Sequence, residues 1–118
     1  MRPRRVLPLF IAGFLVLPLT ACGGGGSDEP SQSERLQAIG QAQVAFQQAK
    51  VAGKDLSAGP CIAESLPAPG LSDWVADIAH DPRQDVDDEA ENQCQRYRDG
   101  DAHHFVELTP DGQLIRAE

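Results

Sequence analysis

Basic residues are scarce in this sequence, and their shortage limits the partners that the protein can bind. The 118 residues include 10 lysines and arginines against 18 aspartates and glutamates, which gives a formal net charge of −8 at pH 7. A surface with this excess of negative charge repels nucleic-acid phosphates and anionic lipid headgroups. Nucleic-acid binding is therefore not expected, and cationic or neutral partners are favoured.

The sequence also lacks the motifs of common metal and catalytic sites. Its three cysteines, Cys22, Cys61 and Cys94, include no CxxC pair of the kind used in redox and zinc-binding proteins. There is no HExxH motif and no recognisable Ser-His-Asp pattern. We therefore expect no cofactor, and a binding module is favoured over an enzyme.

The first 22 residues have the pattern of an export signal. Three arginines in the first five residues precede an apolar stretch at 6–19, which is shorter than the roughly 20 residues that a membrane-spanning helix needs. The stretch ends in LTAC, at 19–22, and four glycines follow. This order of basic start, apolar core, LTAC box and glycine linker resembles the precursors of bacterial lipoproteins, over residues 1–22 only.

The resemblance implies an address for the protein and a modification of Cys22. In such precursors the signal peptide, here residues 1–21, is cleaved, the cysteine thiol carries a diacylglyceryl group and the new amino terminus is usually acylated. Several acyl chains hold a protein firmly at a membrane. Cleavage would remove three of the ten basic residues and none of the eighteen acidic ones, so the mature charge would be −11. We expect a protein anchored in the bacterial cell envelope by lipid on Cys22, facing the periplasm or the exterior.

Residues 22–32 are predicted to be a flexible tether, because GGGGSDEPSQ has no apolar side chain to bury. A chain of about ten such residues has a root-mean-square reach of roughly 17 to 19 Å. The remaining residues, 33–118, suit one small domain. At that size a covalent cross-link helps stability, and Cys61 and Cys94 form an even pair in an oxidising compartment, so we expect a disulfide between them.

The domain is predicted to begin with an amphipathic helix that is capped by Ser31 and Glu34 and ends near Gly53. The apolar stripe expected to face the domain comprises Leu36, Ile39, Ala42, Phe46 and Ala49. The opposite side consists mostly of glutamine. Packing on the domain is the favoured interpretation, and a partner-binding helix or a stalk that extends the tether is the alternative.

Two further short helices are predicted in the middle of the chain. The proline- and glycine-rich stretch at 53–70 should be a loop, with a short extended piece at 61–63. Ser72 and Pro82 would bound one helix, although the alternation of Trp74, Ala76 and Ile78 also permits a strand.

The second short helix is predicted over 85–100, with its acidic residues at the start and its arginines at the end. The acidic run DVDDEAEN, at 85–92, fails the EF-hand pattern for calcium, and we interpret it as the solvated start of this helix. The inner face of the helix would carry Cys94.

The C-terminal residues carry the clearest turn signal. Pro110, Asp111 and Gly112 predict a three-residue hairpin loop that sets Leu108 opposite Leu114 and Thr109 opposite Gln113. In this register His104 would lie opposite Glu118. The expected fold is therefore a small α+β domain with an N-terminal amphipathic helix, one or two further short helices and a C-terminal β-hairpin, cross-linked by one disulfide.

The histidines are the candidates for chemistry. His80, His103 and Glu107 are the residues proposed for a metal site, whereas His103 and His104 would point to opposite faces of a strand and so would not share one. In the other interpretation the histidines have no functional role and pair with nearby acids. Trp74 and His104 are candidate binding residues.

Two function classes follow from these observations. The favoured class is a non-enzymatic, lipid-anchored module that binds an envelope protein, a peptide or a cationic ligand through the hairpin edge or the region of Trp74. The alternative is a metal-binding protein or metal-dependent enzyme that uses the three proposed ligands.

Overall fold

The structure is a computed structural model in which residues 29–118 are described. The predicted signal peptide, Cys22 and most of the tether lie outside the described residues. Within residues 29–118, no helix combines the length and the apolar character that crossing a membrane requires.

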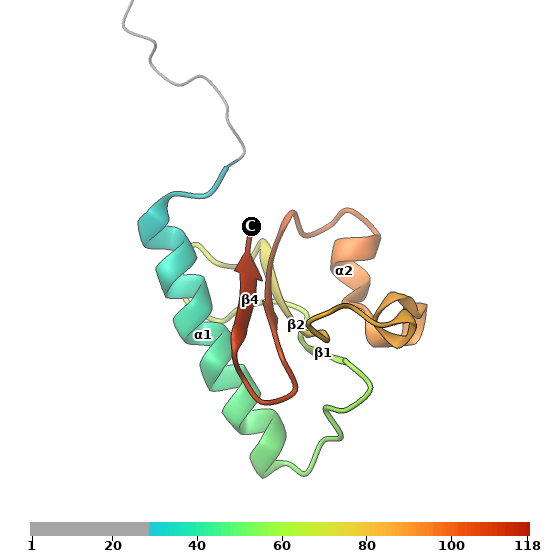
Figure 1. The fold of residues 1–118 in the computed structure, drawn as a ribbon. Coiled ribbons are helices and arrows are strands. Elements are labelled where there is room, and N and C mark those ends of the chain that lie inside the picture. Colours follow the sequence, from blue (N-terminus) through green and yellow to red (C-terminus); the bar gives the residue numbers. More distant parts are fainter. Residues whose placement is uncertain (1–28) are drawn as a thin grey trace, which may run out of the picture.

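A single four-stranded sheet forms the centre of the domain (Figure 1). Its strands lie side by side in chain order β1-β2-β3-β4, with antiparallel outer pairs and a parallel β2–β3 pair. The elements along the chain are α1 (Gln32–Val51), β1 (Cys61–Ala63), β2 (Trp74–Ile78), η1 (Asp85–Asp88), η2 (Ala90–Asn92), α2 (Gln95–Arg98), β3 (His104–Leu108) and β4 (Leu114–Ala117). The predicted α+β class, with its hairpin and disulfide, is confirmed.

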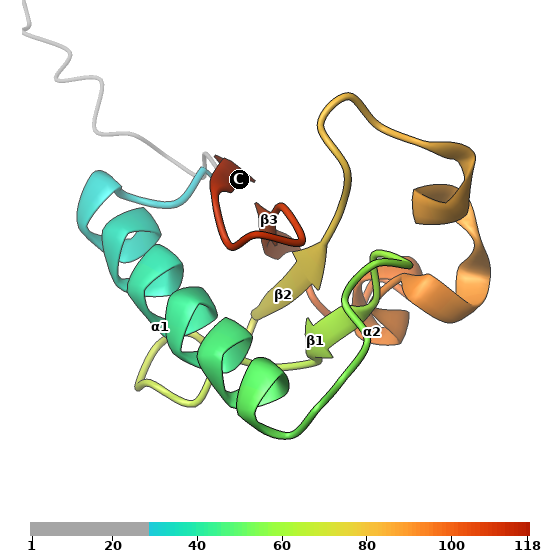
Figure 2. The same cartoon turned by 60° about the horizontal axis from the view of Figure 1, so that its bottom comes forward.

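The two faces of the sheet are covered by different elements. Helix α1 crosses one face, and the segment with η1, η2 and α2 lies on the other side (Figure 2). The main apolar core lies between α1 and the sheet and includes Phe46, Trp74 and Ile78. A smaller cluster on the other side contains Val75, Cys94 and Ala102.

Helix α1 begins as predicted, but its buried stripe is rotated. The hydroxyl of Ser31 accepts a hydrogen bond from the Glu34 amide at 3.1 Å. The Glu34 carboxylate, rather than completing the capping box, accepts a hydrogen bond at 3.0 Å from the indole Nε1 of the fully buried Trp74. Leu36 is 62% exposed, and the buried positions are Ala38, Ala42, Phe46 and Ala49. Three alanines allow the helix to lie close to the sheet, which explains why this stripe faces inward.

The helix predicted between Ser72 and Pro82 is wrong, and the strand that the sequence also permitted is present as β2. The strand lies between β1 and β3 and is buried on both sides. Trp74, Ala76 and Ile78 contact the α1 core, whereas Val75 belongs to the smaller cluster on the opposite face. A strand covered on both faces has a nearly continuous apolar sequence, which periodicity alone does not separate from a buried helix.

The second short helix, predicted over 85–100, is not continuous, and only its C-terminal end is α-helical, as α2. Two 3₁₀ turns, η1 and η2, and the single-turn helix α2 take its place. Asp87, which we had placed on a solvated surface, is 1% exposed and accepts hydrogen bonds from the backbone amides of His80 and Gln84 at 3.0 and 2.9 Å. Burial acts to raise the pKa of Asp87, but these amides and the His80 ring lower it overall. The buried carboxylate holds this segment in tight turns.

The hairpin of β3 and β4 has the predicted loop and a bulge that changes the predicted register. Leu108 lies opposite Leu114, and the Thr109 amide donates to the Gln113 carbonyl at 2.8 Å, as expected. The predicted pairing of His104 with Glu118 is wrong. Glu118 exchanges two backbone hydrogen bonds with Phe105, because an irregularity between Glu107 and Leu108 shifts the pairing by one residue.

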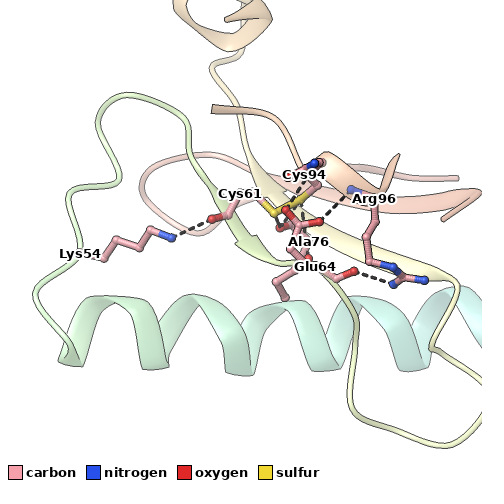
Figure 3. Close-up of a disulfide and its surroundings, with 8 residues drawn as sticks. Lys54, Cys61, Glu64, Ala76, Cys94 and Arg96 are labelled. Carbon is pink, nitrogen blue, oxygen red and sulfur yellow. Dashed lines mark hydrogen bonds between the residues drawn. A yellow bond between two sulfur atoms is a disulfide. The ribbon is translucent and has the colours of Figure 1, made fainter. Parts of the chain in front are cut away.

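The disulfide between Cys61 and Cys94 is confirmed, and it joins β1 to the residue before α2 (Figure 3). The backbone amides of Gln95 and Arg96 donate to the Glu64 carboxylate at 2.9 and 3.0 Å. The Arg96 guanidinium donates to the carbonyls of Glu64 and Ser72. The cross-link closes a loop with a sequence separation of 33, and on the chain-entropy model a loop of that size stabilises the fold by roughly 3 to 4 kcal/mol.

We predict that Gly112→Ala destabilises the domain much more than Gly53→Ala does. Both glycines have positive φ, 87° and 74°, so both substitutions strain the backbone by roughly 1 kcal/mol. A Cβ at Gly112 would lie 2.6 Å from the Phe46 ring, whereas a Cβ at Gly53 would meet nothing within 4 Å. Urea unfolding should show an additional loss of about 1 to 3 kcal/mol for Gly112→Ala. Equal losses for the two variants would contradict the packing of the hairpin loop on Phe46.

Candidate functional site

A cleft of about 360 Å³ lies on the sheet face opposite α1. Its volume falls within the range of small-molecule sites in proteins. The cleft is lined by the sheet residues Val75, Asp77, Phe105, Glu107 and Arg116 together with Arg83, Gln93, Cys94, Tyr97 and Arg98 from the segment that crosses over the sheet.

Two neighbouring carboxyl groups line the cleft because of the strand register. Asp77 on β2 is paired with Glu107 on β3 in the parallel ladder, so the two side chains project from the same face. The alternation that turns Trp74, Ala76 and Ile78 toward α1 turns Asp77 to the opposite side. One acidic residue in each of two central strands is thereby brought to one site.

Glu107 is paired with two arginines. It is 7% exposed, and its carboxylate accepts from Arg116 Nε at 3.1 Å and lies 3.3 Å from Arg83 Nη1. Arg83 also forms an ion pair with Asp88 at 2.9 Å. The charges of Arg83 and Arg116 are therefore balanced by carboxylates that already contact them.

Asp77 has no such partner. Its Oδ1 atom is buried and forms no hydrogen bond among the described residues. Burial, together with the nearby Glu107 carboxylate, raises the pKa of Asp77 to about 8. At pH 7 the group is thus mainly a neutral carboxylic acid, which can donate as well as accept a hydrogen bond.

Arg98 and two aromatic rings complete the site. The exposed Arg98 side chain lines the cleft from α2, and none of the side-chain hydrogen bonds or ion pairs found within residues 29–118 involves it. The rings of Tyr97 and Phe105 meet edge to face with centroids 5.1 Å apart, and the Arg116 guanidinium lies 4.9 Å from the Phe105 centroid. The cleft therefore contains the three guanidinium groups of Arg83, Arg98 and Arg116, the carboxyl group of Glu107 and the mainly neutral Asp77.

This arrangement suits a ligand that carries a carboxylate on an apolar body. An unpaired guanidinium is a strong donor to a carboxylate, and a neutral carboxyl group nearby can add a further hydrogen bond. The aromatic rings and Val75 offer apolar contact. The cleft is therefore positive locally, in a protein whose overall charge is strongly negative.

The structure does not bring together the three residues proposed for a metal site. His80 follows the end of β2 and His103 precedes the start of β3, so the parallel pairing of these strands puts them at opposite ends of the sheet. Nδ1 of His80 lies 2.9 Å from Asp87, and Nδ1 of His103 lies 2.9 Å from Asp73. Glu107 is paired with arginines. His80 and His103 thus each pair with a nearby acid, as in the interpretation that gives the histidines no functional role.

One other group of potential metal ligands occurs among the described residues, formed by Cys61, Glu64 and Cys94. Both sulfur atoms of this group belong to the disulfide, and the Glu64 carboxylate is occupied by two backbone amides. The group therefore serves to hold α2 in place and has no free thiolate to offer a metal.

The two residues proposed for binding have different surroundings from those expected. Trp74 is fully buried in the core, so it is not available to a partner in this structure. His104 is half-buried and stacks on Trp74 with ring centroids 5.0 Å apart. His103 is exposed and His104 is not, which agrees with their expected opposite directions.

Sequence reasoning missed the residues that make up the cleft, above all Asp77 and Arg98. The available signal was a single acidic residue inside each of two apolar segments, WVADI and HFVEL. Because the first segment was predicted to be a helix, the pairing of its acidic residue with that of the second segment could not be predicted. No family model, curated protein or solved structure matches this chain in the three comparisons.

We predict that the stability of the folded protein falls as the pH rises from about 4 to 8, and that Asp77→Asn removes this part of the pH dependence. Over this interval the folded protein keeps a proton on Asp77 that the unfolded chain has released, because the pKa is raised from 3.8 to about 8. The slope for one such proton is at most about 1.4 kcal/mol per pH unit. Urea unfolding of both proteins at several pH values measures the difference. Parallel stability curves for the two proteins would contradict the assignment.

Proposed function

We propose that the protein is a non-enzymatic binding module, anchored by lipid in the bacterial cell envelope, that holds a small carboxylate-bearing ligand in the cleft above the disulfide. The observation that carries the ligand class is the presence, in one cleft, of an arginine side chain without a partner and a buried carboxyl oxygen without a partner. Buried polar groups are seldom left without hydrogen bonds in folded proteins, and such groups in a cleft are candidates for ligand contacts.

The chemistry of the cleft supports an anionic rather than a cationic ligand. A carboxylate placed against Arg98 would neutralise the one guanidinium of the cleft that no carboxylate contacts, and the neutral Asp77 would donate its proton in a hydrogen bond. A cation would instead meet three guanidinium groups. This proposal departs from the expectation drawn from net charge, which favoured cationic or neutral partners for the surface as a whole.

The envelope address is supported by the sequence pattern that ends at Cys22. The LTAC box and its flanks account for residues 1–22, and the acid- and glycine-rich residues after them would link the domain to the lipid anchor. A soluble binding domain held near a membrane would sample ligands that pass through the envelope.

The anchor predicts a specific modification. Expressed in a bacterium, the protein should be cut before Cys22 and carry a diacylglyceryl group on that thiol, and Cys22→Ser should leave the membrane fraction. Intact mass spectrometry of the membrane fraction measures both cleavage and acylation. An uncut, unmodified chain would refute the lipoprotein assignment without affecting the cleft.

The ligand class is tested with three probes that share a phenyl group and a two-carbon chain: phenylacetate, phenethylamine and 2-phenylethanol. In NMR titrations at pH 7, phenylacetate should shift the signals of Tyr97, Phe105 and Arg98 at the lowest concentration. Affinity for phenylacetate should then fall above pH 8, where the ionised Asp77 repels it. In Asp77→Asn the affinity should stay constant over the same range.

Arg98→Gln should weaken phenylacetate binding by about tenfold or more, which corresponds to the loss of one charge-assisted hydrogen bond. Lys50→Gln is the matched control, since it removes the same charge from α1, on the other side of the sheet. Stronger binding of phenethylamine, or equal effects of the two glutamine variants, would overturn the proposed ligand class.

A further inference from the structure

The outer face of α1 carries apolar side chains that no other part of the described domain covers. Leu36, Val44 and Val51 are 62%, 49% and 90% exposed. At 100° per residue these three positions fall within about 80° of one another, and the centre of this arc is about 180° from the buried stripe. A shallow groove with an almost entirely apolar surface follows the second half of the helix along Val44, Gln47, Gln48 and Val51.

This face also differs from the rest of the protein in charge. From residue 35 to residue 54 the chain contains Arg35, Lys50 and Lys54 and no acidic residue. The one acidic residue of α1, Glu34, is turned toward the Trp74 indole. All 18 acidic residues of the chain, Glu34 among them, lie outside residues 35–54. A negatively charged surface therefore repels most of the domain and does not repel the outer face of α1.

The position of α1 in the chain places it close to the proposed anchor. Only residues 23–31 separate Cys22 from the first residue of α1, and a flexible chain of about this length reaches roughly 17 to 19 Å. Over such short tethers the effective concentration of the second site reaches the order of millimolar. Even a face with only weak affinity for the bilayer is then in contact with the bilayer for much of the time.

We propose that the outer face of α1, formed by Leu36, Val44, Val51 and the glutamines between them, rests on the lipid bilayer to which the protein is anchored. The inference rests on the proposed lipid anchor. The apolar side chains enter the headgroup region, and Lys50, on the flank of this face, lies near anionic headgroups. The acidic surfaces of the domain then point away from the membrane.

Docking of this face fixes the direction of the cleft. Helix α1 covers one face of the sheet (Figure 2). The residues that line the cleft lie on the other face. With α1 on the bilayer, the sheet lies between the membrane and the cleft. Arg98 and Asp77 therefore face the aqueous compartment, where a dissolved carboxylate would approach them.

The test uses the full mature protein, with acylation of Cys22 confirmed by mass, in nanodiscs of phosphatidylethanolamine and phosphatidylglycerol at a ratio of about 3:1, the lipid ratio of a generic anionic bilayer. A small fraction of the lipids carries a gadolinium chelate on the headgroup. The amide signals of Leu36, Val44 and Val51 should broaden at least several-fold more than those of Tyr97 and Arg98. Equal broadening on both sides of the domain would overturn the inference.

Two variants separate this face from a general effect of charge. Val44→Asp combined with Val51→Asp should abolish the difference in broadening while the lipid keeps the protein in the nanodisc. Ser72→Asp combined with Gln113→Asp adds the same charge at exposed positions outside α1 and should preserve the difference. Loss of the difference in both double variants would contradict a specific role for α1.

A second copy of the chain is the competing occupant of this face. Sedimentation of the non-lipidated Cys22→Ser protein should show a monomer, and a dimer that Val44→Asp and Val51→Asp abolish would overturn the assignment to the membrane. Absence of acylation would overturn the anchor and this inference together, whereas an acylated protein with uniform broadening would overturn this inference alone.

Discussion

The cross-link between Cys61 and Cys94 is the constraint on which the cleft depends. The segment between β2 and β3 must pass from one end of the parallel pair to the other, and it does so without a long helix. Its apolar cluster is small, consisting of Val75, Cys94 and Ala102 with a few partly buried neighbours. The disulfide, the Glu64 contacts and the buried Asp87 replace the packing that a longer helix would supply. Arg98 is thereby held over the sheet face that carries Asp77.

The two faces of the sheet have different surroundings, because successive side chains along each strand point to opposite faces. Side chains turned toward α1 form an apolar core, and the Trp74 indole in this core donates a hydrogen bond to Glu34. Side chains turned the other way include Asp77, Glu107 and Arg116, and Arg83 and Arg98 reach the same cleft from the segment between β2 and β3. Glu107 pairs with the guanidinium groups of Arg83 and Arg116, whereas Asp77 pairs with neither, and burial raises the pKa of Asp77. The asymmetry between two adjacent carboxyl groups is what gives the cleft its chemical character.

The sequence was sufficient for those features that local signals determine. Ser31 marked the start of α1, Pro110-Asp111-Gly112 marked the hairpin loop, and the even cysteine pair marked the disulfide. Features that depend on contacts between residues distant in the sequence could not be predicted from the sequence. WVADI is a central strand because both of its faces are covered, and DVDDEAEN forms 3₁₀ turns because Asp87 is drawn inward by His80 and Gln84. The cleft was missed for the same reason, since Asp77 and Glu107 meet only through the pairing of two strands that are distant in the sequence.

The apolar residues form two separate clusters, and this separation affects which parts of the protein unfold locally. Helix α1, the β-hairpin and the inner side of the sheet share the larger cluster, whereas the crossover segment relies on the smaller one and on its covalent link. Cooperative units of unequal stability open separately in native proteins. Reduction of the Cys61–Cys94 bond would therefore remove the covalent hold on the segment between β2 and β3, whereas the larger cluster contains neither cysteine and would keep its packing.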